Sequence, residues 1–195
     1  MKKFLVLLLA ALTMITFTAC GGSAEKTSSS AAQAEAPADK ILVVYFSCTG
    51  HTKTAALEVA ELLNADIFEI VPEQAYTSDD LNYNIEDCRA NLEQKDSSAR
   101  PAIKNKIDNP AQYKTIVIAF PIWWGAEPRI IDTFVESYDL AGKTIVPVCT
   151  SGGSDIQTSV MNLKGLCKGA TVTEGKRLGI ISKDEVKVWL DSLKL

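Results

Sequence analysis

The sequence has little histidine and no excess of basic side chains. Its 195 residues contain 20 lysines and arginines, 24 acidic residues and one histidine, with a formal net charge of −4. If Lys2 and Lys3 are removed with a leader, 18 basic residues face 24 acidic ones, a balance of −6. Nucleic-acid binding requires a basic footprint, so we expect no nucleic-acid partner.

Several familiar motifs are also missing. The five cysteines contain no CxxC pair, which leaves a metal site or a thioredoxin-like redox motif without support. Neither GxxxxGK[ST] nor GxGxxG occurs, so a Walker loop and the common dinucleotide fingerprint are not indicated. No internal repeat is visible.

The first residues read as an export signal. Lys2 and Lys3 precede an apolar run that ends at Ala19, which is short for a membrane span of roughly 20 residues. The ending Phe-Thr-Ala-Cys resembles the lipobox of bacterial lipoproteins. We therefore predict a signal peptide at 1–19, lipidation of Cys20, and anchoring on the outer face of the bacterial cytoplasmic membrane. The alternative is a secreted protein whose Cys20 is not lipidated.

Residues 21–39 lack large apolar side chains entirely. Such a segment cannot bury enough surface to offset its ordering entropy. We predict a flexible tether at 20–39, with membrane contact through the lipid anchor only, and a folded domain at 40–195.

Strand and helix patterns alternate through this domain. Continuous apolar runs or β-rich patterns predict strands at 41–46, 66–71, 114–120, 143–150 and within 170–179. Apolar residues at helical spacing predict helices at 52–63, 78–94, 128–138, 155–167 and 182–193. Residues 97–112 look like a connecting loop. Five β–α repeats indicate an α/β fold with a doubly wound parallel sheet covered by helices on both faces.

Ligands of such sheets bind beyond the carboxyl ends of the strands. Three loops follow the strongest strands, and they are rich in small, hydroxylic or aromatic residues: Ser47, Cys48, Thr49, Gly50, His51 and Thr52; Pro121, Ile122, Trp123, Trp124 and Gly125; Thr150, Ser151, Gly152, Gly153 and Ser154. We take these loops as the candidate cofactor site, without catalytic residues or a metal.

The first loop suits a phosphate. It runs directly into a helix N-terminus, where free N–H groups and a partial positive charge favour an anion. Gly50 allows close backbone approach, and Ser47, Thr49 and Thr52 supply hydroxyl groups. The alternative is a plain strand-to-helix turn capped by Thr52.

The second loop favours a planar ligand. Adjacent side chains on extended backbone point in opposite directions, so Trp123 and Trp124 cannot both face the core. We predict that Trp123 reaches the ligand and that Trp124 packs on the core side. A phosphate site beside an aromatic platform suggests a planar cofactor with a phosphate tail.

The segments YFSCTGHT, FPIWWG and TSGGS resemble the three FMN-binding loops of the flavodoxin family, over roughly residues 40 to 195. The resemblance implies a flavodoxin-like fold with strand order 2-1-3-4-5 and noncovalently bound FMN. Two departures stand out. The third loop lacks the aromatic residue that many flavodoxins place on the outer flavin face. The family's carriers are usually cytoplasmic, whereas this chain begins with a predicted export signal.

Three functions fit these features. The first is a membrane-tethered FMN protein that transfers electrons outside the cytoplasm to a redox partner protein or a small-molecule acceptor. The second is an FMN-dependent reductase that passes electrons from a reduced nicotinamide to quinone-type acceptors. The third is an interaction module that has lost its flavin.

Several side chains carry more specific expectations. With strand 114–120 lying between their strands, Cys48 and Cys149 should be roughly 9–10 Å apart, too far for a disulfide. Cys88 and Cys167 should be buried thiols on helix faces. We expect His51 and Arg129 to point to solvent and Tyr76 to lie in the core or at the rim of the site.

Overall fold

The computed structural model describes residues 40–179 and 181–195. The predicted signal peptide at 1–19, the tether at 20–39 and the lipidation site Cys20 lie outside these residues and remain predictions.

The described residues form a six-stranded sheet in which every strand pair is parallel. The strands are β1 (Lys40–Tyr45), β2 (Asp66–Glu69), β3 (Tyr113–Pro121), β4 (Thr144–Thr150), β5 (Thr171–Val172) and β6 (Lys176–Leu178). Their order is β2-β1-β3-β4-β5, with β6 also paired to β4. The predicted doubly wound fold and strand order 2-1-3-4-5 are therefore confirmed.

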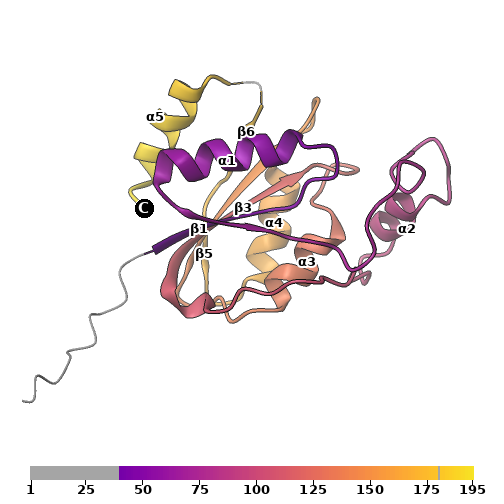
Figure 1. The fold of residues 1–195 in the computed structure, drawn as a ribbon, viewed down its shortest axis with the longest axis horizontal. Coiled ribbons are helices and arrows are strands. Elements are labelled where there is room, and N and C mark those ends of the chain that lie inside the picture. Colours follow the sequence, from indigo (N-terminus) through magenta and orange to yellow (C-terminus); the bar gives the residue numbers. More distant parts are fainter. Residues whose placement is uncertain (1–39, 180) are drawn as a thin grey trace, which may run out of the picture. The chain divides into compact units, whose positions relative to one another are not determined.

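Helices cover both faces of this sheet (Figure 1). They are α1 (His51–Leu63), α2 (Arg89–Lys95), α3 (Arg129–Glu136), α4 (Gln157–Leu166) and α5 (Lys183–Leu193), together with a 3₁₀ turn, η1 (Pro110–Gln112). A capping box marks the start of α5. Ser182 Oγ accepts from the amide of Glu185, and the Glu185 side chain accepts from the amide of Ser182. In the described part of the chain, no helix combines the length and apolar content that a membrane crossing needs.

The alternation of side chains along β1 divides the core into two layers. Leu42 and Val44 pack with α3 and α4, whereas Val43 and Tyr45 pack with α1 and α5. All four are at most 4% exposed, and burying an aliphatic side chain stabilises the fold by about 1.5–3 kcal/mol. The continuous apolar run therefore reflects a strand that is buried on both faces.

The predicted strand within 170–179 is interrupted. Ile145 of β4 is paired with Val172 and Val148 with Lys176, so the outer strand contains one residue more than β4 between these pairs. Pro147 lies opposite this interruption and has no amide hydrogen to donate to a neighbouring strand. The segment consequently splits into β5 and β6.

The predicted helix at 78–94 is wrong over its first half. The chain makes turns there, and α2 begins only at Arg89. Asp80 accepts hydrogen bonds from the amide and hydroxyl of Thr77 at 2.8 and 2.9 Å, and such local side-chain bonds compete with helix formation. The expected apolar face fails with it, because Ile85 and Leu92 are exposed and Cys88 is buried as the residue that caps α2.

Candidate functional site

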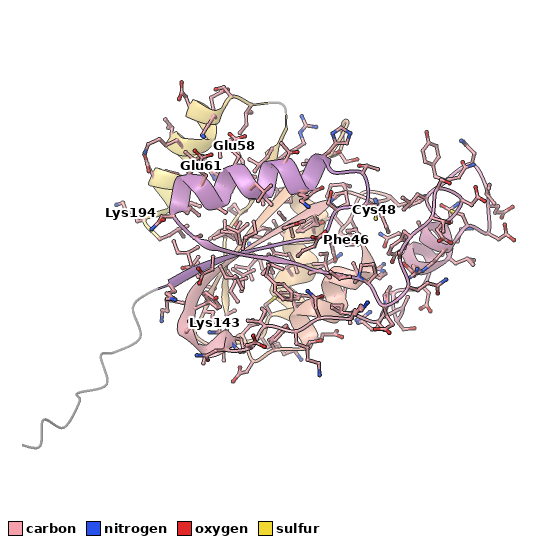
Figure 2. The ribbon with its side chains drawn as sticks, viewed as in Figure 1. Phe46, Cys48, Glu58, Glu61, Lys143 and Lys194 are labelled. Atoms are coloured by element: carbon pink, nitrogen blue, oxygen red, sulfur yellow. The ribbon has the colours of Figure 1, made fainter. Side chains whose placement is uncertain are left out.

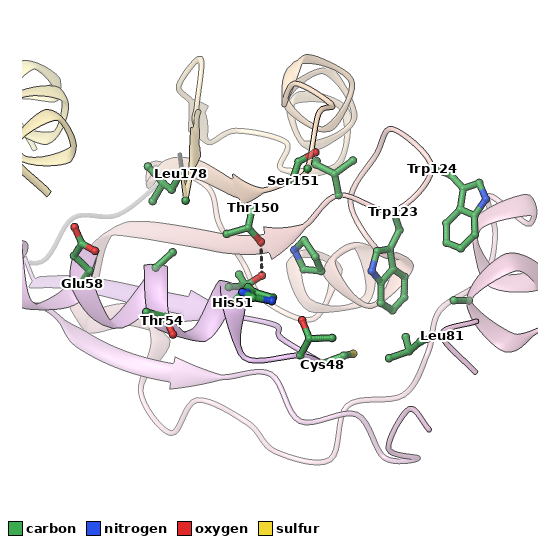
Figure 3. Close-up of a pocket in the computed structure, with 18 of the residues that line it drawn as sticks. Cys48, His51, Thr54, Glu58, Leu81, Trp123, Trp124, Thr150, Ser151 and Leu178 are labelled. Carbon is green, nitrogen blue, oxygen red and sulfur yellow. Dashed lines mark hydrogen bonds between the residues drawn. The ribbon is translucent and has the colours of Figure 1, made fainter. Parts of the chain in front are cut away.

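A cavity of about 920 Å³ opens at the carboxyl edge of the sheet (Figure 3). Phe46 and Cys48 mark this edge at the end of β1 (Figure 2). The three predicted loops meet in its wall through Cys48, Thr49, His51, Thr52, Pro121, Ile122, Trp123, Trp124, Thr150, Ser151 and Gly152. The other predicted residues belong to the same loops without lining the cavity, namely Ser47, Gly50, Gly125, Gly153 and Ser154.

The first loop has the backbone of an anion site. Gly50 adopts the left-handed conformation at φ +88° immediately before α1, a geometry that glycine accepts without a Cβ penalty. Its amide donates to Ser47 Oγ at 3.1 Å, and its carbonyl accepts from the amide of Thr54 at 3.0 Å. The amides at the start of α1 have no intrahelical acceptor and can bind an anion.

Direct hydrogen bonds join the three loops. The hydroxyl groups of Thr52 and Thr150 are 2.7 Å apart, linking the start of α1 to the end of β4. The amide of Ile122 donates to the carbonyl of Thr150 at 3.0 Å, linking the second and third loops. Thr52 is 2% exposed, so the first loop is seated in the core at this point.

The second loop is a tight turn, called here the Trp turn (residues 123–126). The amide of Trp123 donates to the carbonyl of Ala126 at 2.9 Å, and the reverse bond measures 3.1 Å. Trp124 and Gly125, the two central residues, have φ of +50° and +81°, as a type I′ turn requires. Trp124 is 53% exposed, so the prediction that it packs on the core side is wrong. The turn replaces the extended backbone on which that prediction depended.

Trp123 connects the cavity wall to the core. Its ring meets those of Phe46 and Tyr76 edge to face, with centroids 5.6 and 5.4 Å away. Tyr76 packs against the core cluster, as expected, and donates its hydroxyl to Glu93 Oε2 at 2.5 Å. Burial and this carboxylate raise the pKa of Tyr76 well above its usual range, which keeps its hydroxyl a donor.

The four described cysteines are free thiols, and the predicted absence of a Cys48–Cys149 disulfide is confirmed. β3 separates their strands, as the predicted strand order requires. Cys88 and Cys167 are buried as expected. Burial raises the pKa of Cys149 to about 12, so this thiol stays protonated.

The charges around the cavity are sparse. The described residues that line it include one acidic side chain, Glu58, and neither lysine nor arginine, and His51 is exposed as expected. An anion here would therefore be held by backbone amides and hydroxyl groups. Arg177 instead supports the third loop, since its Nη1 donates to the carbonyls of Gly153 and Ser154 at 2.8 and 3.4 Å.

Sequence reasoning missed the part of the wall that lies outside the three loops. It consists of Thr54, Ala55, Glu58, Leu81, Tyr83, Ala90, Leu178, Gly179, Ile181 and Val186. Most of these residues come from α1, the turns before α2 and the segment around β6. Their helical or apolar patterns give no local sign that they face a ligand.

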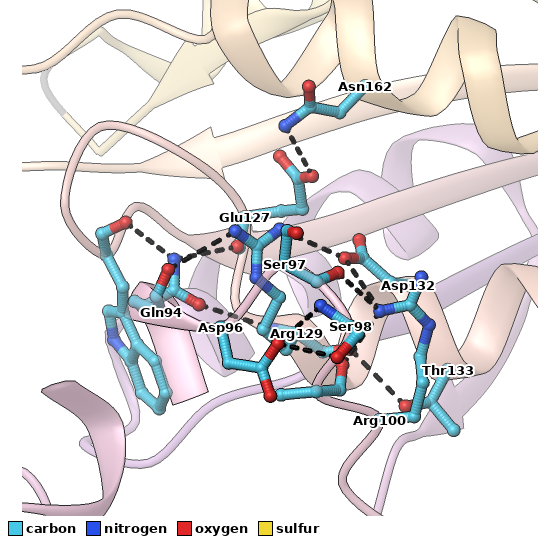
Figure 4. A network of polar contacts seen from close by, with 12 residues as sticks. Gln94, Asp96, Ser97, Ser98, Arg100, Glu127, Arg129, Asp132, Thr133 and Asn162 are labelled. Carbon is cyan, nitrogen blue, oxygen red and sulfur yellow. Dashed lines mark hydrogen bonds and ion pairs between the residues drawn. The ribbon is translucent and has the colours of Figure 1, made fainter. Parts of the chain in front are cut away.

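Arg129 was also misjudged, because its side chain is only 15% exposed rather than solvated. Its Nη1 lies 3.2 Å from Asp132 Oδ2, within a network of polar side chains (Figure 4) that reaches the Trp turn through Gln94. Glu127 belongs to the same network and is completely buried. Sequence reasoning did not single out Glu127, although an acidic residue between a glycine turn and a proline is the available signal.

Comparison with known proteins agrees with this geometry. The family model described as Flavodoxin matches residues 40–193. A protein of Bacteroides eggerthii DSM 20697 assigned as a flavoprotein is 42% identical, covers 80% of this chain and 98% of its own, and superposes with a TM-score of 0.77. A protein of Bacteroides uniformis ATCC 8492 with the same assignment is 43% identical over 78% and 97%, with a TM-score of 0.75.

A flavoprotein from Lactobacillus acidophilus NCFM, solved in complex with FMN, shares the fold at 24% identity, with coverages of 78% and 99% and a TM-score of 0.62. Comparison with curated proteins found no match. The family match spans nearly the whole described region, and the sheet order and loop arrangement agree with it. This chain is a member of the flavodoxin family.

Proposed function

We propose that this protein binds FMN noncovalently in the cavity at the carboxyl edge of its sheet. The observation that carries the proposal is the meeting of an anion-binding helix start, at Gly50 and α1, with an aromatic wall at Trp123. These two features match the phosphate and the flat ring of one ligand. The flavoprotein assignment of the 42–43% identical relatives supports a flavin as the ligand. The FMN complex of the L. acidophilus protein supports FMN as the particular flavin.

In this proposal different residues contact the phosphate and the ring of the ligand. The amides at the start of α1 and the hydroxyl groups of Thr49 and Thr52 hold the phosphate, while Ser47 supports the loop by accepting from the amide of Gly50. Trp123 stacks against the ring, and the Thr150–Ser154 loop borders its edge. The bound flavin supplies the electron-transfer chemistry, while the protein orients it and limits its contact with water.

We propose that the protein carries electrons outside the cytoplasm while tethered through lipidated Cys20. Its partner would be a redox protein or a small-molecule acceptor. The leader sequence supports this location, and fractionation tests it. Wild-type protein should sediment with membranes and Cys20→Ser should not; sedimentation of both would contradict the lipid anchor.

The visible spectrum of the purified protein, reconstituted with FMN, tests the cofactor. We expect flavin absorption that remains with the protein through gel filtration. Loss of the flavin at this step would favour the interaction module that has abandoned the cofactor.

A second candidate is an FMN-dependent reductase of quinone-type acceptors. It is favoured by the third loop, where Thr150, Ser151, Gly152, Gly153 and Ser154 place no aromatic ring over the flavin and leave a face open to substrate. Catalytic oxidation of NADH or NADPH with a quinone present would support the reductase. Flavin that exchanges electrons only with protein partners would support the carrier.

A further inference from the structure

Glu127, directly after the Trp turn, is a carboxyl group with no access to solvent. Its carboxyl group points toward Asn162 of α4 (Figure 4). An ionised carboxylate is costly to bury unless it is paired and hydrogen-bonded. The surroundings of Glu127 therefore decide whether it carries a charge.

Its hydrogen bonds are incomplete. Glu127 Oε1 accepts from Asn162 Nδ2 at 2.9 Å, but Glu127 Oε2 has no partner among the described residues. Asp132 Oδ1 is equally without one in the same part of the chain, and Asp132 is 2% exposed. Besides burial, the negative charge of Asp132 contributes to the raised pKa of Glu127, so the two carboxyl groups interact electrostatically. One proton on Glu127 Oε2, donated to Asp132 Oδ1, would satisfy both atoms.

The proton belongs on Glu127 rather than on Asp132. The Nη1 atoms of Arg129 and Arg100 lie 3.2 and 3.8 Å from Asp132 Oδ2, whereas no guanidinium group in the described residues pairs with Glu127. Burial raises the pKa of both carboxyl groups, and the two arginines oppose that rise at Asp132. Asp132 thus keeps the negative charge.

The backbone of Glu127 is tied to the turn that carries the tryptophans. Gln94 Nε2 donates to the carbonyls of Trp123 and Glu127 at 3.0 and 3.1 Å. Gln94 Oε1 accepts from the amide of Arg129 at 3.2 Å. A negative charge on Glu127 would be repelled by Asp132, and the strain would reach the Trp turn through these shared bonds.

We infer that Glu127 is a positioning residue, which holds the Trp turn in place as a neutral carboxylic acid that donates its proton to Asp132. It does not line the cavity and acts through Trp123 and Trp124. Its effect on ligand binding rests on the proposed flavin site, whereas its effect on the turn does not.

The dependence on pH has a definite sign. The pKa of Glu127 is raised in the folded protein, so unfolded chains release this proton at lower pH and the folded state is progressively destabilised as pH rises above the ordinary carboxyl range. The loss stops once folded Glu127 is also ionised. Burial raises the pKa of nearby Cys167 to about 11, so it stays neutral over this range. The other polar groups around Glu127 are the charged Asp132, Arg129 and Arg100, Glu136 paired with Arg100, and the uncharged Asn162, Ser159 and Gln94.

Glu127→Gln tests the inference because its amide can donate permanently where the carboxylic acid donates only while protonated. FMN affinity of the full-length protein would be measured by quenching of flavin fluorescence from about pH 5 to about pH 9. We expect the wild-type protein to lose about tenfold in affinity relative to Glu127→Gln toward alkaline pH, equivalent to about 1.4 kcal/mol. Titration of FMN itself cancels in this comparison. The control Glu61→Gln, an exposed carboxylate on α1 paired with Lys183, should follow the wild type.

Near-UV circular dichroism of the flavin-free proteins provides a second readout, since Trp123 packs against Phe46 and Tyr76. The aromatic signal should weaken with rising pH in the wild type and stay constant in Glu127→Gln. An affinity and an aromatic signal that fall with rising pH as much in Glu127→Gln as in the wild type would overturn the inference. If no protein binds FMN, the proposed function fails, and the dichroism still decides the role of Glu127. Glu127→Leu should weaken the aromatic signal at every pH, but the Gln comparison does not depend on that variant folding.

Discussion

Gly50 shows how a single backbone conformation prepares the site. Its φ of +88° turns the chain from β1 into α1, and a Cβ there would meet no atom within 4 Å. The cost of a larger residue therefore comes from the left-handed backbone, at about 1–2 kcal/mol, and from crowding of whatever lies over the loop.

We predict that Gly50→Ala lowers the free energy of unfolding by about 1–2 kcal/mol and weakens FMN binding further than this. Urea unfolding and FMN titration would measure the two effects. Gly152→Ala is the matched control, because Gly152 lines the cavity with ordinary backbone and open space around it. Equal loss of stability in both variants would contradict the conformational explanation.

The two tryptophans should separate stability from binding. Trp123→Ala removes two edge-to-face pairs worth about 0.5–1.5 kcal/mol each, so the flavin-free protein should unfold more easily and FMN affinity should fall. Trp124→Ala removes an exposed ring and should change the unfolding free energy by no more than about 0.5 kcal/mol. Thermal melting of both flavin-free variants checks this. A large destabilisation confined to Trp124→Ala would show that the turn is assigned incorrectly.

At the scale of elements, β6 supports the third loop through Arg177. We predict that Arg177→Ala weakens FMN binding by about tenfold, the equivalent of about 1.4 kcal/mol, because the Gly153 and Ser154 carbonyls lose their donor. Isothermal titration would measure the affinity, with Lys176→Ala on the same strand as control. Unchanged affinity in Arg177→Ala would mean that the loop holds its shape without β6.

The elements differ in how well sequence predicts them. β1, β3 and β4 were found because continuous apolar runs are typical of strands buried on both faces. The turns before α2 were mistaken for a helix, because Leu81, Ile85, Cys88 and Leu92 have helical spacing by chance. The Asp80 hydrogen bonds that form turns in place of this helix depend on local geometry, which spacing does not encode.

The sequence predicted part of the candidate site, as it predicted part of the fold. Its three loops follow strand ends, so topology alone brings them together. Leu178, Ile181 and Val186 reach the cavity only through tertiary packing. Glu127 was missed for another reason, since only the fold reveals that it is buried beside Asp132.

At the scale of the whole molecule, an acidic flavodoxin domain follows a predicted lipid anchor and tether. This arrangement would keep the proposed cofactor near the membrane surface while leaving the domain free to meet partners. The proposed function depends on the binding of a phosphorylated flavin by this domain. Without such binding, the first loop would be an ordinary strand-to-helix turn.

The relative affinity of the purified protein for FMN and riboflavin tests this claim most directly. Riboflavin has the same ring but lacks the phosphate that the start of α1 would hold. We predict that FMN binds at least about a hundredfold more tightly, equivalent to about 2.7 kcal/mol. Equal affinity for the two flavins would contradict the phosphate site and with it the central account of the cavity.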